Sequence, residues 1–136
     1  NEDYLFINRT SKVPIKKGVF AIINKMKKSY KERALQVKII EENMRQSPYP
    51  IIVCGDFNDT PISYTYNKIK GNLMDSFTIS GVGIGDSYVK IPMLRIDYIM
   101  HDKKFNSYNY QKQKKIFSDH YAISCEINIF DITSKK

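Results

Sequence analysis

Cysteine and histidine are scarce in this chain of 136 residues, and long apolar runs are missing. Two cysteines, Cys54 and Cys125, cannot by themselves build a disulfide framework or a structural zinc site. No stretch approaches the roughly 18 consecutive apolar residues that a membrane-spanning helix needs. Hydrophobic residues make up 42% and charged residues 26% of the sequence, which excludes a disordered tail, a collagen-like fibre and a low-complexity segment. The composition therefore predicts a globular chain with one hydrophobic core.

Positive charge is in surplus. The chain has 22 Lys and Arg against 14 Asp and Glu, a net charge of +8 and a pI of about 9.4. Such a surplus favours a polyanionic partner, which could be nucleic acid, a phosphorylated substrate or an acidic membrane surface. The basic residues are densest in the amino-terminal third, on the polar side of a predicted helix, where a solvated surface explains them equally well. The charge alone does not identify a substrate.

Hydrophobic periodicity divides the chain into a helical part and a part rich in short strands. Residues 1–17 are polar and are expected to be irregular, whereas residues 19–46 have the 3.6-residue period of a long amphipathic helix. The Ser47-Pro48 pair should end that helix. Residues 49–130 should form a sheet, in which Cys54 is expected to be buried and His101 exposed. The expected elements are strands at 49–54, 93–100, 103–110 and 121–129, a helix at 62–69 with Pro61 in its first turn, a strand or short helix at 73–79, and a loop at 80–92.

Three polar clusters lie where apolar strands end. Asp56 and Asn58 follow the first strand. Residues two positions apart in an extended segment point to the same side. Arg95 and Asp97 share a face of a predicted strand, and a carboxylate on a buried strand face needs a partner. Ser118, Asp119 and His120 precede the last strand.

Each cluster also has an ordinary structural explanation. Asp-Phe-Asn after a strand is typical of an Asx-turn that caps a helix, and Asp97 beside Arg95 is typical of an ion pair. Ser-Asp-His is common in turns, and a single histidine such as His120 is usually hydrogen-bonded for structural reasons. The three clusters together, in this order and each at a strand end, favour a shared site instead.

The combination resembles the endonuclease/exonuclease/phosphatase superfamily, whose fold is that of DNase I. The resemblance rests on GDFNDTP at 55–61, RIDYIM at 95–100 and SDH at 118–120, with a long helix before the first motif. The resemblance covers residues 19–126, and the Tyr- and Lys-rich sequence is closer to bacterial members than to the named repair enzymes.

The resemblance implies a role for each matching residue. Asp56 would orient or deprotonate the attacking water, and Asn58 would hydrogen-bond the scissile phosphate. His120 would contact a phosphate oxygen in the transition state, while Asp97 would hold its imidazole in one tautomer. Arg95 and Ser118 would support these residues.

A divalent cation belongs to this chemistry. The resemblance implies that Asp119 helps to bind Mg²⁺ or Mn²⁺, since oxygen ligands select these ions. The principal metal-binding glutamate of the family, and an asparagine and a histidine of its first half, have no match in this chain. We therefore expect the carboxy-terminal half of a four-layer α/β (α+β) sandwich, in which the long helix packs on one mostly antiparallel sheet. We also expect this half, taken as a single partial domain over residues 1–136, to be inactive alone and to self-associate through its uncovered sheet face.

The function implied for the whole protein is hydrolysis of a phosphodiester or phosphomonoester by in-line attack of water, as a nuclease or a phosphatase. The alternative is a catalytically inactive basic module that binds nucleic acid or anionic phospholipid. Lys112, Lys114 and Lys115, near Tyr108 and Tyr110, either contact phosphate or belong to a solvated loop. Nucleic acid, phospholipid and inositol phosphate all remain open as substrates, as do a cytoplasmic, an exported and a membrane-associated location.

Overall fold

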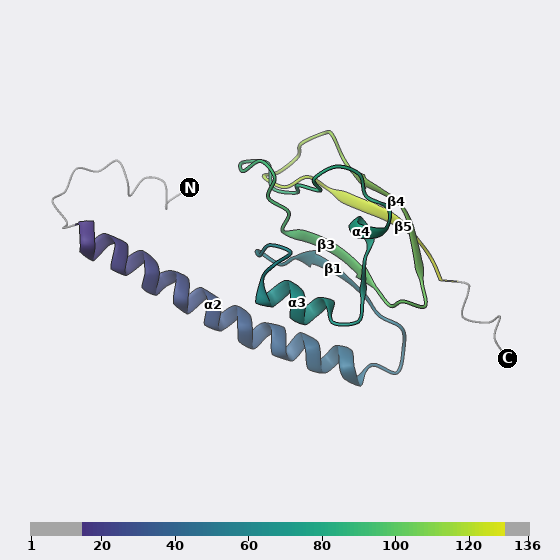
Figure 1. Ribbon diagram of the computed structural model, residues 1–136, viewed down its shortest axis with the longest axis horizontal. Helices are drawn as coiled ribbons and strands as arrows, with labels where there is room; N and C mark the ends of the chain where they lie inside the picture. The colour runs from purple at the N-terminus through teal and green to yellow at the C-terminus, as the bar shows by residue number, and fades with distance from the viewer. Residues whose placement is uncertain (1–14, 130–136) are drawn as a thin grey trace. The chain divides into compact units, whose positions relative to one another are not determined.

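The computed structural model describes the backbone of residues 15–129 and the side chains of residues 31–129 (Figure 1). The chain divides into two compact units, residues 1–33 and residues 34–136. The described part of the first unit is the amino-terminal portion of helix α2 (Ile15–Gln46). The second unit holds the end of that helix, all the described strands and every candidate site residue.

Helix α2 begins at Ile15, so residues 15–17 are helical and not irregular as expected; residues 1–14 lie outside the described part. The helix ends before Ser47-Pro48, as predicted, and its last turn carries Arg45, whose charge is favourable at a helix carboxyl end. Val37, two turns before Met44, is buried and belongs to the hydrophobic core, whereas Leu35 and Ile39 are exposed.

A three-stranded antiparallel sheet has the order β1-β3-β2, from β1 (Ile52–Asp56), β3 (Asp97–His101) and β2 (Met74–Asp75). The register pairs Ile52 with His101 at one end of β1 and Asp56 with Asp97 at the other. Strand β3 is shorter than the predicted 93–100. Met93 belongs to a turn with a φ of +67° and residues 94–96 are irregular, and Ser87 Oγ accepts the backbone N–H groups of Ile96 and Asp97 where the strand begins.

Strands β4 (Asn106–Lys112) and β5 (Ile123–Asn128) pair antiparallel with each other as a second sheet. The expected antiparallel pairing is confirmed, but the described strands form two hydrogen-bonded sheets and not one. The register shifts between Tyr108 and Gln111, where Asn109 has a φ of +53°. An extra residue of this kind bends the strand and interrupts the ladder locally.

Two short helices connect the strands. Helix α3 (Tyr64–Lys70) is capped by Ser63, whose Oγ accepts from the Tyr66 amide at 3.1 Å, so Pro61 lies before the cap and not in the first turn. Gly71 ends this helix with a φ of +41°, which glycine adopts without steric cost. Residues 73–79 contain both alternatives of the prediction: β2 is followed directly by helix α4 (Ser76–Ser80), which Asp75 caps.

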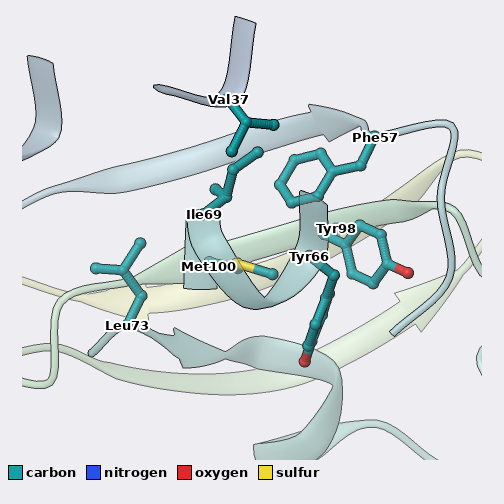
Figure 2. Close-up of a cluster of buried hydrophobic side chains, with 7 residues drawn as sticks. All are labelled: Val37, Phe57, Tyr66, Ile69, Leu73, Tyr98 and Met100. Carbon is teal, nitrogen blue, oxygen red and sulfur yellow. The ribbon is translucent and has the colours of Figure 1, made fainter. Parts of the chain in front are cut away.

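The core lies between α3, the end of α2 and one face of the three-stranded sheet (Figure 2). Tyr98 and Met100 alternate along β3 and point into the core. Val53 of β1 and Ile51, the residue before β1, pack against the core. Its aromatic centre is Tyr98, with the ring of Phe57 at 4.8 Å and that of Tyr66 at 4.9 Å between centroids. The cluster contains Val37, Phe57, Tyr66, Ile69, Leu73, Tyr98 and Met100.

Two burial predictions are wrong. Cys54 is exposed and Ile52 is 45% exposed, because both lie on the face of β1 opposite to the core. His101, expected on the surface, is fully buried, because β3 is the central strand with β1 and β2 on its two sides. In the described part of the chain, no helix combines the length and the apolar character that a bilayer crossing requires.

Candidate active site

The site lies where β1 ends and β3 begins. Asp56 is the last residue of β1 and Asp97 the first of β3, and the antiparallel register places them directly opposite each other. Both residues thus come to one edge of the sheet through ordinary strand pairing, although 40 residues of chain separate them.

A third segment brings His120 to the same edge. An isolated antiparallel bridge pairs His120 with Tyr88, and it is held by backbone hydrogen bonds from Val89 N–H to Asp119 O (2.9 Å) and from Tyr121 N–H to Ser87 O (2.8 Å). Ser87 also accepts the amides of Ile96 and Asp97. The loop 87–89 therefore links the start of β3 to the segment that carries His120.

The ligand-bearing atoms of Asp56, Asp97 and His120 all lie within 4.8 Å of one another, with Asp56 exposed and the other two half-buried. One carboxylate from each of the first two polar clusters and the histidine of the third therefore meet in space. Joint placement of this kind is what a shared site requires and what separate caps and turns would not need.

His120 and Asp97 form the closest pair in the group. The Nδ1 atom of His120 lies 2.8 Å from Oδ2 of Asp97, so Nδ1–H donates to the carboxylate and leaves Nε2 for other partners. This hydrogen bond raises the pKa of His120 above its usual value; burial opposes the shift, and the charges of Asp97, Asp56 and Asp119 add to it. The ring also packs edge-on against Tyr88, at 5.2 Å between centroids.

Ser118 orients the backbone of the histidine. Its Oγ accepts from the His120 amide at 3.0 Å and donates to the His120 carbonyl at 3.1 Å. In the described structure the recorded hydrogen bonds of Ser118 go to the main chain of residue 120, and its supporting role stays a prediction.

Asp56 and Asn58 are joined within one turn. The Asn58 amide donates to Asp56 Oδ1 at 2.7 Å, and the Asn58 side-chain Nδ2 donates to Oδ2 at 2.9 Å. Asn58 has a φ of +49°, a conformation that asparagine tolerates better than most residues. The ordinary explanation of this motif, an Asx-turn, is thus present geometrically, and the same turn places a carboxylate and an amide at the edge of the site.

Asp119 stands outside the group of three. Its carboxylate is half-exposed and lies 3.5 Å from Lys90 Nζ. A hydrogen bond from its own backbone N–H lowers its pKa, and the Lys90 ammonium adds to the effect. It is nevertheless close enough to act electrostatically on the imidazole of His120.

Arg95 is not the partner of Asp97. Its Nη1 donates to both carboxylate oxygens of Asp75, at 3.1 and 2.8 Å, and the guanidinium lies over the rings of Phe77 (4.7 Å) and Tyr98 (4.8 Å). The predicted pairing within the strand is wrong because residue 95 lies in the irregular segment before β3 and its side chain is buried. Arg95 is a buried structural residue behind the site.

Two residues that sequence reasoning missed hold the site in place. Asp75 accepts the Tyr66 hydroxyl at 2.8 Å as well as Arg95, and the pKa of Tyr66 rises to about 12 through burial and this bond. Tyr98 Oη lies 2.9 Å from the carbonyl of Asp59 and 2.8 Å from that of Arg95, so its hydroxyl joins the turn after β1 to the turn before β3. Burial raises the pKa of Tyr98. The Tyr in RIDYIM was the available signal for this contact.

The three lysines predicted to contact phosphate, Lys112, Lys114 and Lys115, have different surroundings. Lys112 donates to Asp86 at 2.7 Å and lies 4.6 Å from the centroid of the Tyr121 ring, so it has structural partners. Lys115 lies over the ring of Phe117 at 4.9 Å. Lys114 and Lys115 are exposed in the connection between β4 and β5, next to the segment that carries His120.

The residues present fit a divalent cation. Mg²⁺ is commonly held by one or two protein carboxylates, with water and substrate phosphate completing its shell. The exposed carboxylates of Asp56 and Asp119 would supply such ligands, whereas Nδ1 of His120 is already engaged by Asp97. The donor set offers carboxylate oxygens and no thiolate.

Comparison with solved structures identifies proteins with a similar fold. The chain is similar to a mannosyl-6-phosphatase of Bacteroides thetaiotaomicron (21% identity, TM-score 0.56) and to an endonuclease/exonuclease/phosphatase family protein of the same organism (22%, 0.62). It is also similar to a functionally unknown conserved protein of Enterococcus faecalis (18%, 0.58). Each match covers 71% of this chain and 44% of the other, so the chain spans less than half the length of the structures it matches. No curated protein matches the sequence.

These likenesses confirm the expected fold class, a partial DNase I-like α/β fold with antiparallel sheets. The sequence model of the Endonuclease/Exonuclease/phosphatase family matches residues 24–120, which includes all three motifs. The chain belongs to the Endonuclease/Exonuclease/phosphatase family.

Proposed function

We propose that the whole protein is a divalent-metal-dependent phosphoesterase and that this chain carries the Asp–His part of its catalytic centre. The observation that supports this most is the meeting of Asp56, Asp97 and His120 within 4.8 Å at one sheet edge. Family membership supports a hydrolase of phosphate esters, and the phosphatase among the structural neighbours fits a phosphomonoester as substrate.

The chemical task is in-line displacement at phosphorus. A water oxygen forms a bond to phosphorus while the bond from phosphorus to the leaving oxygen breaks, and the water gives up a proton. Asp56, which is exposed beside His120, is placed to orient that water and take its proton. The leaving oxygen is protonated afterwards by solvent or by an acid of the site.

His120 and Asn58 would stabilise charge on the phosphate. With Nδ1 bound to Asp97, Nε2 of His120 is the atom that can donate to a phosphate oxygen, and the raised pKa favours the protonated ring that does so. The side chain of Asn58, anchored to Asp56, offers a further N–H at the same edge. A bound Mg²⁺, held by Asp119 or Asp56, would neutralise charge on the transferring group.

The proposal is tested on the protein at its natural length, assayed with Mg²⁺ on a phosphomonoester such as mannose 6-phosphate and on a phosphodiester. His120→Ala, Asp56→Ala and Asp97→Asn should each lower kcat/KM about 10²–10⁴-fold, the usual contribution of such groups. Asp102→Asn is the matched control. This aspartate lies just beyond the other end of β3, where its carboxylate accepts from the Lys104 amide, and its loss should leave turnover unchanged. Turnover that survives all three site substitutions would refute the proposal.

The chain alone should be inactive, since its carboxylates supply only part of a metal shell and it spans less than half of its structural neighbours. A Mg²⁺-dependent rate from residues 1–136 alone, abolished by Asp56→Ala or His120→Ala, would contradict this expectation. The alternative, a catalytically inactive basic module, is less favoured because binding through charge alone does not need an oriented Asp97–His120 pair.

A further inference from the structure

Two loops flank the segment that carries His120, and each combines lysine with large apolar residues. Residues 90–93 read Lys-Ile-Pro-Met and residues 114–117 read Lys-Lys-Ile-Phe. Lys90 Nζ lies 3.5 Å from Asp119, and Val89 N–H bonds to Asp119 O, so the first loop adjoins the site directly. The second loop runs into Ser118-Asp119-His120 through the chain itself. We call these two segments the rim loops.

The apolar side chains of the rim loops point into solvent. Ile91 is 47% exposed, Met93 69%, Ile116 52% and Phe117 79%. Apolar side chains of this size are unfavourable in water and gain free energy when an apolar phase covers them. Ile62, in the turn after the Asp56–Asn58 motif, is 90% exposed as well. What distinguishes the rim loops from other exposed apolar positions is their direct connection to the segment that carries Asp119 and His120.

Lysines accompany these side chains on both loops. Lys90 forms an ion pair with Asp119, but in the described part of the chain no carboxylate pairs with Lys114 or Lys115. Lys115 Nζ lies 4.9 Å from the centre of the Phe117 ring, so a cation and an exposed apolar group form one unit at the tip. A lysine whose stem lies along apolar groups while its ammonium meets anions is suited to the boundary between lipid headgroups and acyl chains.

Nucleic acid is a poorer match for this surface. Proteins that bind single strands use aromatic rings for base stacking and arginine for planar contacts, and the rim loops hold one aromatic residue and no arginine. Three of the four exposed apolar side chains are aliphatic, and aliphatic groups gain more from entering an acyl layer than from contact with a phosphate backbone.

We propose that the rim loops dock the catalytic edge onto an anionic phospholipid surface, with Ile91, Met93, Ile116 and Phe117 entering the interface and Lys114 and Lys115 contacting headgroups. Docking would present the site to phosphate esters at that surface. The inference concerns binding and not hydrolysis, so it stands or falls independently of the proposed function.

The test measures binding of the natural-length protein to vesicles of phosphatidylcholine with and without phosphatidylserine, by co-sedimentation. Ile116→Ser/Phe117→Ser should weaken partitioning onto phosphatidylserine vesicles at least about tenfold, as expected for losing two buried apolar side chains. Tyr49→Ser is its control: this residue is 77% exposed but precedes the opposite end of β1, and it should bind as the parent does.

The charge contribution is tested with two lysine pairs. Lys114→Gln/Lys115→Gln should lower binding to phosphatidylserine vesicles about 30-fold, since each lysine near such a surface contributes about 1 kcal/mol. Lys103→Gln/Lys104→Gln removes the same charge from exposed positions beyond the other end of β3 and should have much less effect. All four variants alter exposed side chains, and circular dichroism checks that each is folded.

Three results would overturn the proposal. Equal losses from the two lysine pairs would show attraction by net charge alone. Unchanged binding of Ile116→Ser/Phe117→Ser would show that no apolar group enters the membrane. Tight binding to a single-stranded oligonucleotide that depends on Lys114 and Lys115, without vesicle binding, would assign the surface to nucleic acid.

Discussion

The Asp97–His120 pair makes the site sensitive to pH. The 2.8 Å hydrogen bond favours the protonated imidazole, so the pKa of His120 in the fold exceeds the value near 6.5 of the unfolded chain. The pair therefore stabilises the fold fully below about pH 6.5, and that stabilisation is lost as the pH rises through the higher folded pKa. NMR titration in the presence of a chelator should give His120 a raised pKa, and Asp97→Asn should lower it. Equal pKa values in the two proteins would contradict the pairing.

Tyr98 supplies a second test at this scale. Its ring is 1% exposed, and its hydroxyl serves the carbonyls of Asp59 and Arg95. Tyr98→Phe should lower the free energy of unfolding by about 1–3 kcal/mol, because the two carbonyls share the single O–H proton of Tyr98 and lose it. Tyr108→Phe, at a half-exposed position, is the control and should change little in urea unfolding. A Tyr98→Phe protein as stable as the parent would show that these carbonyls find other donors.

At the scale of single residues, the sequence motifs predicted which side chains lie together, and their catalytic roles stay predictions. Asp56, Asn58, Asp97 and His120 come together as the motifs implied, because strand pairing places the ends of β1 and β3 side by side. The partner of Arg95 could not be predicted. Asp75 is 20 residues away and carries no motif, and only the packed core brings it to the guanidinium.

Among the elements, the buried Asp75–Arg95 pair joins α4, α3 and the start of β3. Asp75 caps α4, accepts the Tyr66 hydroxyl from α3 and binds Arg95, and it is 1% exposed. Asp75→Asn should destabilise the fold by about 3–5 kcal/mol, because it leaves the guanidinium buried without a counter-charge. Asp75→Leu/Arg95→Met should recover part of that loss. Glu42→Gln, which breaks the exposed Glu42–Arg45 pair of α2, is the control and should leave unfolding by urea nearly unchanged.

The elements themselves were predictable to different degrees. Strong periodicity predicts helix α2, and a β-branched run predicts strand β1. Strand β2 and helix α4 lie one after the other within seven residues, and the sequence pattern there permits either structure. The division into two sheets is a matter of long-range pairing, which no local pattern specifies.

At the scale of the whole molecule, the outer face of β1 remains uncovered. Ile52 is 45% exposed and Cys54 is exposed, and each lies on the side of the strand away from the core. We expect residues 1–136 alone to self-associate through this face, and sedimentation equilibrium should show a mass above that of the monomer. Ile52→Glu should shift the equilibrium toward monomer, and Tyr49→Glu, an exposed residue before the strand, should not. A monomer that binds no hydrophobic dye would contradict this expectation.

The packed aromatic rings of the core have a practical consequence for observing this protein. The chain contains ten tyrosines and no tryptophan, so its near-ultraviolet spectrum is a tyrosine spectrum. Tyr66 and Tyr98 are held 4.9 Å apart in fixed orientation, and neighbouring chromophores in such a geometry couple their transitions. The circular dichroism of the tyrosine band therefore contains a contribution from the packing of α3 against β3, and it is measured without a label.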